Sequence, residues 1–274
     1  MEIIDTHAHL NFTAFAKDYK QVLEKCRSLG IAVINVGTNY PTSQKAVEMA
    51  ETENNVYAAI GLHALNIGQS EPSADIGELK DCLERDFDYA LYEKLGRSKK
   101  AVAIGEAGLD YYYKPKTKTK FEVFKNQQLG ILKKQTDLAC ELDLPVIFHV
   151  RMAHEDLIEF LEKEKNSGKD IRGVIHCFTG TLNQAKAYLD LGLYIGLNGI
   201  IFKIDLNEVI LNLPKDRIVF ETDCPYLAPP GISGRNEPSN IEFVIERAAR
   251  IRKEQAAEVK RYSTENAKKL FSIM

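Results

Sequence analysis

The 274-residue sequence contains no tryptophan, no Cys-x-x-Cys pair and no apolar stretch near the ~20 residues that a membrane-spanning helix needs. Its five cysteines are odd in number and far apart, which argues against a disulfide framework or a structural zinc knuckle and predicts reduced thiols. These are Cys26, Cys82, Cys140, Cys177 and Cys224. An apolar run begins at Ile3 and leaves no space for a signal peptide. We therefore expect a cytoplasmic protein that does not bind membranes, and nothing indicates an obligate protein partner.

Strong charge of either sign is also absent. The formal net charge is -3, so no global positive field attracts nucleic acid, and a polyanion must be held by local contacts or by metal. No Gly-x-Gly-x-x-Gly opens a β-α turn, and Gly105-Glu106-Ala107-Gly108 lacks the lysine of a phosphate-binding loop. These absences argue against a dinucleotide- or nucleotide-binding fold. With 45% hydrophobic residues the chain can bury a large core, and we expect one domain over residues 1–274.

The sequence alternates between apolar runs of strand length and longer segments of helical period. Such alternation is typical of repeated β-α units around a parallel sheet. The expected strands lie near 2–6, 31–37, 56–62, 101–106, 145–149, 173–177, 193–198 and 217–222. The expected helices span 19–29, 41–53, 76–95, 121–142, 155–165, 182–191, 206–213, 241–253 and 255–271. The pattern predicts an α/β protein, a single (β/α)8 TIM barrel with an additional C-terminal helix; an open doubly wound sheet is the alternative.

Chemically active side chains stand at or just beyond the ends of six of these apolar runs. Because the carboxyl ends of barrel strands converge on one face, imidazoles and carboxylates at these positions predict a metal site there. The residues are His7, His9, His63, Glu106, His149, His176 and Asp223.

The spacing of these residues indicates how they can share ions. His7 and His9 are two residues apart, so on a strand both side chains face the same way and can hold one ion. The Glu106 carboxylate can bridge two cations, and Asp223 can both bind an ion and accept a proton from water. His149 and His176, at the ends of the fifth and sixth strands, are placed for a second ion. This arrangement predicts a hydrolase that uses two divalent ions, and the ligand types leave magnesium, manganese and zinc open.

Seven segments together resemble the TatD family of metal-dependent deoxyribonucleases across nearly the whole chain. They are IDTHAHL (4–10), GLH (61–63), IGEAGLDYY (104–112), HVR (149–151), HCFTG (176–180), ETDCPYLAP (221–229) and RNEP (235–238). The resemblance implies a (β/α)8 barrel that hydrolyses DNA, often as a 3' to 5' exonuclease on single strands. It also implies one metal held by His7, His9, Glu106 and Asp223, and a second held by Glu106, His149 and His176. His63 and Arg235 would contact the substrate phosphate.

Three loops depart from the family pattern, and all lie outside the expected ligands. Ala64 follows His63 where the family usually has proline, and Ser233-Gly234 precedes Arg235-Asn236 where Gly-Lys is frequent. The segment from Asn198 to Lys203 is shorter than usual and lacks a threonine. These departures bear on substrate preference rather than on hydrolysis.

Several further residues are candidates for supporting roles. Lys203, like Arg235, can neutralise a phosphate. The run Tyr111-Tyr112-Tyr113 can stack bases beside Lys114 and Lys116 or simply cover the barrel top. Arg151 and Glu221 can orient neighbouring metal ligands. His154 is expected at the surface or as a helix cap.

Two other functions remain open at this level. The same metal-bound hydroxide can attack the carbonyl carbon of an ester, lactone or aminoacyl bond in a related amidohydrolase. Cyclic amidases commonly bridge their metals with a carboxylated lysine, and Glu106 in that place disfavours them. A non-catalytic binding barrel would be expected to show broken ligands, and none is broken.

Overall fold

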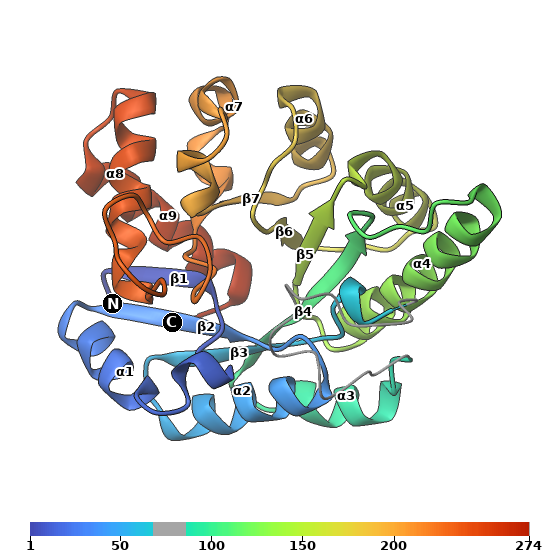
Figure 1. The fold of residues 1–274 in the computed structure, drawn as a ribbon, viewed down its shortest axis with the longest axis horizontal. Coiled ribbons are helices and arrows are strands. Elements are labelled where there is room, and N and C mark those ends of the chain that lie inside the picture. Colours follow the sequence, from blue (N-terminus) through green and yellow to red (C-terminus); the bar gives the residue numbers. More distant parts are fainter. Residues whose placement is uncertain (68–85, 274) are drawn as a thin grey trace.

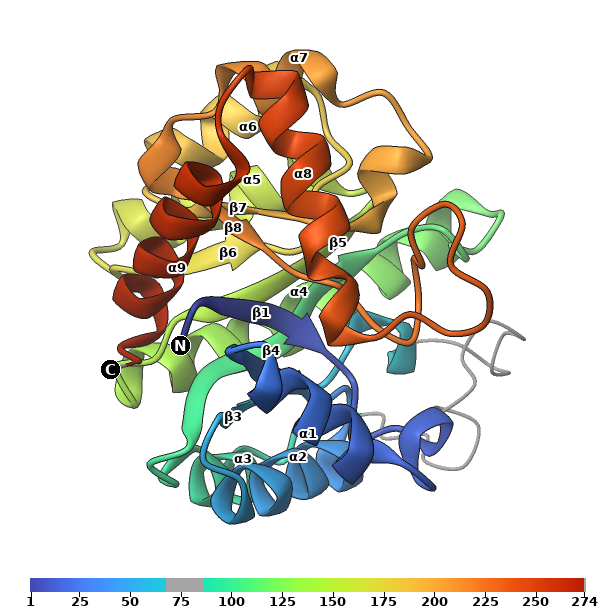
Figure 2. The ribbon, with the colours of Figure 1, turned by 90° about the vertical axis from the view of Figure 1, so that its left-hand side faces the viewer.

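The computed structural model describes residues 1–67 and 86–273. Its eight strands are parallel, pair in sequence order and stand within a ring of helices (Figures 1 and 2). They are β1 (Ile3–Ala8), β2 (Ile31–Val36), β3 (Val56–Ile60), β4 (Ala101–Asp110), β5 (Val146–Arg151), β6 (Gly173–Ile175), β7 (Tyr194–Leu197) and β8 (Ile218–Phe220). Backbone bonds join the two ends of the sheet: Asp223 donates to the carbonyl of His7 (2.8 Å) and His9 donates to that of Cys224 (2.9 Å). The predicted (β/α)8 barrel is confirmed, and the open-sheet alternative is wrong.

In the described part of the chain a helix follows each strand around the ring, and one more helix comes after the eighth. They are α1 (Tyr19–Ser28), α2 (Tyr40–Thr52), α3 (Tyr89–Gly96), α4 (Lys118–Glu141), α5 (His154–Asn166), α6 (Leu182–Asp190), α7 (Asn207–Asn212), α8 (Ile241–Arg252) and α9 (Ala256–Phe271). The helix expected over 76–95 lies partly outside the described residues, and α3 begins only at Tyr89. Asp88 explains that start, because its side chain accepts a hydrogen bond from the Leu91 amide as an N-cap. No helix in the described part of the chain is long and apolar enough to cross a membrane.

Successive side chains along each strand point alternately out of and into the barrel. The buried apolar residues of the described chain accordingly form two clusters. One joins outward-facing strand residues such as Ile31 and Val33 to the surrounding helices. The other contains Ile4, Ala32 and other inward-facing residues, together with Leu270 and Phe271 of α9. The additional C-terminal helix therefore packs against the barrel itself, and both chain termini lie near one another beside it (Figures 1 and 2).

Strand β4 is longer than the expected 101–106 and reaches Asp110. Glycines at 105 and 108 resemble a strand end in the sequence, but Gly108 lies so close to β5 that an added Cβ would stand 1.9 Å from the His149 carbonyl oxygen. Glycine is needed there for the approach of two backbones. The extension pairs Gly108 with His149 and carries Asp110 into the neighbourhood of the site.

The cysteines in the described part of the chain are free, as predicted: Cys26, Cys140, Cys177 and Cys224. Cys82 lies outside the described residues. Cys177, the second residue after β6, leaves the extended conformation (φ 46°) and lines the pocket described below. Burial raises the pKa of its thiol well above the usual value, so it stays protonated.

Candidate metal centre

A pocket of about 360 Å³ opens where the carboxyl ends of the strands meet. Six of the seven chemically active residues expected at the strand ends line it, and the seventh, His7, is fully buried beside them. The six are His9, His63, Glu106, His149, His176 and Asp223. Barrel closure has therefore brought together side chains that are up to 216 positions apart in the chain, as between His7 and Asp223.

His7 and His9 converge, although His9 lies just beyond the end of β1. Their Nε2 atoms are 3.1 Å apart, and that of His7 lies 3.5 Å from Glu106 Oε2 and 3.8 Å from Asp223 Oδ1. The Nδ1 atom of His9 lies 2.9 Å from the carbonyl oxygen of Val36. Since a carbonyl only accepts, His9 must donate from Nδ1, which leaves the Nε2 lone pair facing the site.

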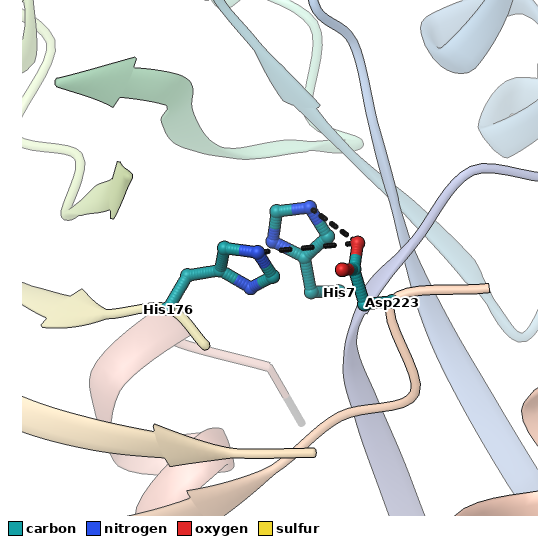
Figure 3. A group of neighbouring side chains, drawn as sticks. All are labelled: His7, His176 and Asp223. Carbon is teal, nitrogen blue, oxygen red and sulfur yellow. Dashed lines mark ion pairs between the residues drawn. The ribbon is translucent and has the colours of Figure 1, made fainter. Parts of the chain in front are cut away.

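His176 joins the same group from β6, and Figure 3 shows it with His7 facing the Asp223 carboxylate. The rings of His7 and His176 stack with centroids 3.5 Å apart, and His176 Nε2 lies 3.9 Å from Asp223 Oδ1. Its other nitrogen, Nδ1, is 2.8 Å from Glu221 Oε1. That oxygen also accepts hydrogen bonds from the Cys177 amide (2.7 Å) and the Asn198 side chain (3.1 Å). Glu221 thus orients His176.

The buried carboxylate of Asp5 fixes the position of Asp223. Asp5 accepts hydrogen bonds from the amide and the hydroxyl of Thr222, at 2.9 and 2.6 Å. This contact holds the segment after β8 against β1, so that the Asp223 side chain meets the two β1 imidazoles.

Glu106 divides its two oxygens between two sets of rings. Oε2 faces His7 and His9, whereas Oε1 lies 2.8 Å from His149 Nδ1 and 3.1 Å from His63 Nε2. The other nitrogen of His149, Nε2, lies 2.9 Å from Asp110 Oδ2, so Asp110 fixes the orientation of the ring. One carboxylate therefore stands between two clusters of nitrogen donors.

His63 differs from His9 in its tautomer. Its Nδ1 accepts a hydrogen bond from the Leu65 amide at 2.9 Å, as it begins the short helix η2 (Ala64–Asn66). A neutral ring with an accepting Nδ1 carries its hydrogen on Nε2, which faces Glu106. His63 is therefore suited to donate a hydrogen bond in the pocket.

Mutual contacts shift the pKa values of Glu106, His7 and His149. Burial alone would raise the pKa of Glu106, but its electrostatic interaction with His63 and the hydrogen bonds from His149 and His63 hold it well below the usual value. Burial and the nearby His176 lower the pKa of His7 to about 4. Against the effect of burial, Asp110 and Glu106 raise the pKa of His149 to about 10.

The sequence model of one protein family, described as TatD related DNase, matches residues 4–272. The chain belongs to the TatD family. A Bacillus subtilis relative, the uncharacterized metal-dependent hydrolase YabD, is 36% identical over 278 residues, 99% of each chain. Pantoea ananatis TatD, named a 3'-5' ssDNA/RNA exonuclease, is 32% identical over 99% of this chain and 100% of its own. The crystal structure of YJJV, a TatD homolog from Escherichia coli, superposes with a TM-score of 0.82 at 29% identity, covering 100% of this chain and 99% of its own.

As a member of the TatD family, the chain is a metal-dependent hydrolase, and its donor atoms gather accordingly. Three groups place one nitrogen or oxygen of each member within 4.8 Å of the others. They are His7, His176 and Asp223; His7, His9 and Glu106; and His63, Glu106 and His149. His176 Nε2 lies equally far, 3.9 Å, from Asp223 Oδ1 and from Glu106 Oε1, so the division of the ligands between two ions that the resemblance implies stays a prediction.

The other predicted substrate contacts of this TatD family member lie elsewhere. Arg235 contacts the Ala14 carbonyl oxygen, pairs with Asp18 at 2.6 Å and stands over the Phe15 ring. Lys203 is exposed at the end of the short helix η3 (Gly199–Phe202). Neither lines the pocket, and a phosphate contact stays a prediction for both.

The residues expected in supporting roles are placed in different ways by the structure. Tyr111 is buried and its hydroxyl donates to Asp156 (2.8 Å), so it does not stack bases. The surface or capping role expected for His154 is wrong: the ring is buried, its Nδ1 lies 3.1 Å from the Tyr188 hydroxyl, and Ala153 is the N-cap of α5. Arg151 lines the pocket, with its guanidinium 3.5 Å from the centroid of the Tyr112 ring.

Sequence reasoning missed Asp110, the partner of His149. The residue lies within the IGEAGLDYY segment and four positions after Glu106, but it follows the predicted end of the strand. Recognition that β4 continues past its glycines would have placed this carboxylate beside β5.

Metal uptake at neutral pH is expected to release protons. The pKa values of His149 (about 10) and His176 (about 9, raised by Glu221 and Asp223 against burial) keep both rings protonated at pH 7 without metal. A ring must lose the proton of the nitrogen that binds an ion, so affinity should rise with pH. Calorimetric titration in two buffers with different ionisation enthalpies measures the release. Identical heats in both buffers would contradict the prediction.

Proposed function

We propose that this chain is a two-metal phosphodiesterase that degrades single-stranded DNA from the 3' end. The position of Glu106 between two clusters of imidazoles is the observation that carries the proposal. It suits a carboxylate that serves two ions, and the number of donors around it exceeds what one tetrahedral ion takes. The names of TatD relatives such as that of Pantoea ananatis support a nucleic-acid substrate.

The donor set fits divalent ions. Neutral imidazole nitrogens and carboxylate oxygens together suit zinc, manganese or magnesium, and Glu221 and Asp110 orient two of the rings from behind. His7, His9 and Asp223 would hold one ion together with Glu106, and His149 and His176 would hold the second with the same carboxylate. Such ions would acidify the attacking water and offset the charge of the phosphate.

The remaining chemistry belongs to the protein side chains. Asp223 borders the pocket, and His176 and His9 hold its pKa below the usual value against the effect of burial. It is therefore ionised at neutral pH and can accept the proton of the attacking water. The Nε2 hydrogen of His63 can be donated to a phosphoryl oxygen, and Arg151 adds positive charge in the same pocket.

The test is a digest of single-stranded DNA labelled at either end, with magnesium, manganese or zinc and with a chelator as control. A 5' label should yield a ladder of progressively shorter products, and a 3' label should be released at once as mononucleotide. Single-stranded RNA and duplex DNA in the same assay determine substrate preference. Hydrolysis of an ester or lactone without any cleavage of nucleic acid would refute the proposal and favour the amidohydrolase alternative. A cytoplasmic location stays a prediction from the sequence.

A further inference from the structure

The segment that joins β4 to α4 has an unusual charge. Its sequence from Tyr111 to Lys120, YYYKPKTKTK, contains four lysines and no acidic residue. Lys114, Lys116, Lys118 and Lys120 are all exposed, and α4 has no acidic residue in its first turn. A protein of net charge -3 thus has a local concentration of positive charge at one place on its surface.

Lys114 stands over the Phe121 ring, 5.3 Å from its centroid, but the other three lysines lack the acidic partners that lysines farther along α4 have. Lys125, Lys133 and Lys134 pair with Asp156, Asp137 and Asp86, at 2.6, 3.2 and 2.6 Å. Over residues 1–67 and 86–273, Lys116 and Lys118 make no ion pair, and the same holds for Lys120. Unpaired like charges in one segment repel one another and destabilise the folded protein. A bound polyanion would relieve this repulsion.

The segment leads directly to the pocket. The Tyr111 amide donates to the Arg151 carbonyl oxygen (2.9 Å), and the Tyr112 amide donates to Asp110 (2.8 Å). These bonds set the Tyr112 ring against the guanidinium of Arg151, which lines the pocket. The Tyr112 residue nevertheless remains 49% exposed. A path along the chain therefore leads from Arg151 at the pocket through Tyr112 to the segment that carries the four lysines.

We propose that this path, formed by Arg151, Tyr112 and the four lysines from Lys114 to Lys120, binds the part of a single-stranded nucleic acid that extends beyond the scissile nucleotide. Lysines that neutralise successive phosphates and an exposed aromatic ring that stacks a base are how sequence-independent single-strand sites work. The inference rests on the proposed function and adds where the uncleaved strand lies. It also explains how a protein of slightly negative charge can hold a polyanion.

The experiment compares two triple variants that remove the same charge. Lys116→Gln, Lys118→Gln and Lys120→Gln alter the path. Exposed lysines at distant sites, changed as Lys99→Gln, Lys186→Gln and Lys269→Gln, form the control. Catalytic efficiency is measured on a long single-stranded oligonucleotide and on a dinucleotide, at saturating metal and at several salt concentrations.

The path variant should lose ~10-fold or more in efficiency on the oligonucleotide at low salt, since three phosphate contacts are gone. The slope of its log KM against log salt should fall by about 2, at ~0.7 per lost contact on a single strand. The loss on the dinucleotide should be far smaller, and the control variant should match the parent on both substrates. Equal losses on both substrates, or a path variant that behaves like the control, would overturn the inference while the proposed function stands. A parent that cleaves neither substrate would overturn both.

Discussion

Asp223→Asn is expected to lower the rate of DNA cleavage at least ~100-fold, because transfer of a proton to a positioned group typically contributes ~10² to 10⁴ in rate. The substitution keeps the shape of the side chain and removes the charge that accepts the proton. The Asp223 carboxylate meets the imidazoles of His7, His9 and His176 at 3.5 to 3.9 Å, so the variant should still fold around them. Single-turnover cleavage of a labelled oligonucleotide at saturating metal measures the effect.

The matched control is Asp216→Asn. This carboxylate is exposed just before β8, whereas Asp223 follows the other end of the same strand. The control should cleave like the parent, and both variants should bind the oligonucleotide when metal is present. If the Asp223 variant cleaves within a few-fold of the parent, Asp223 is not the base and the proposed mechanism is wrong.

Glu106→Ala is expected to abolish activity and to impair both metal sites together. The parent should take up about two divalent ions per chain, since the donors exceed the demand of one tetrahedral site. Among residues 1–67 and 86–273, only Glu106 presents one oxygen to His7 and the other to His149, at 3.5 and 2.8 Å. Removing it would therefore take a ligand from each of the two proposed ions.

The comparison variant is His149→Ala, which should weaken chiefly one ion because the ring contacts one side of Glu106. Elemental analysis and calorimetric titration of both variants give the stoichiometry, and a thermal melt confirms that each is folded. Equal, partial losses in the two variants would argue against a bridging role. Absence of metal binding by the parent would refute the metal centre itself.

Local sequence accounts well for the elements and poorly for their exact ends. Eight strands were expected and the described residues form eight, because apolar runs of strand length alternate with helical periods. The end of β4 was misjudged, since a glycine that lets two backbones approach looks the same in a sequence as one that ends a strand. His154 was misjudged because its burial depends on Tyr188, which arrives from a distant helix.

The sequence by itself determined the barrel and the identity of the residues that gather at its mouth. Parallel strands in one ring must bring their carboxyl ends to one face, so histidines and carboxylates placed there converge whatever the details of packing. Only the tertiary structure decided which atoms face one another. Glu221 orients His176, Asp110 orients His149, and Asp18 holds Arg235 away from the pocket. Each of these pairs joins segments far apart in the chain, and their meeting depends on strand register, barrel closure and loop paths that local sequence does not specify.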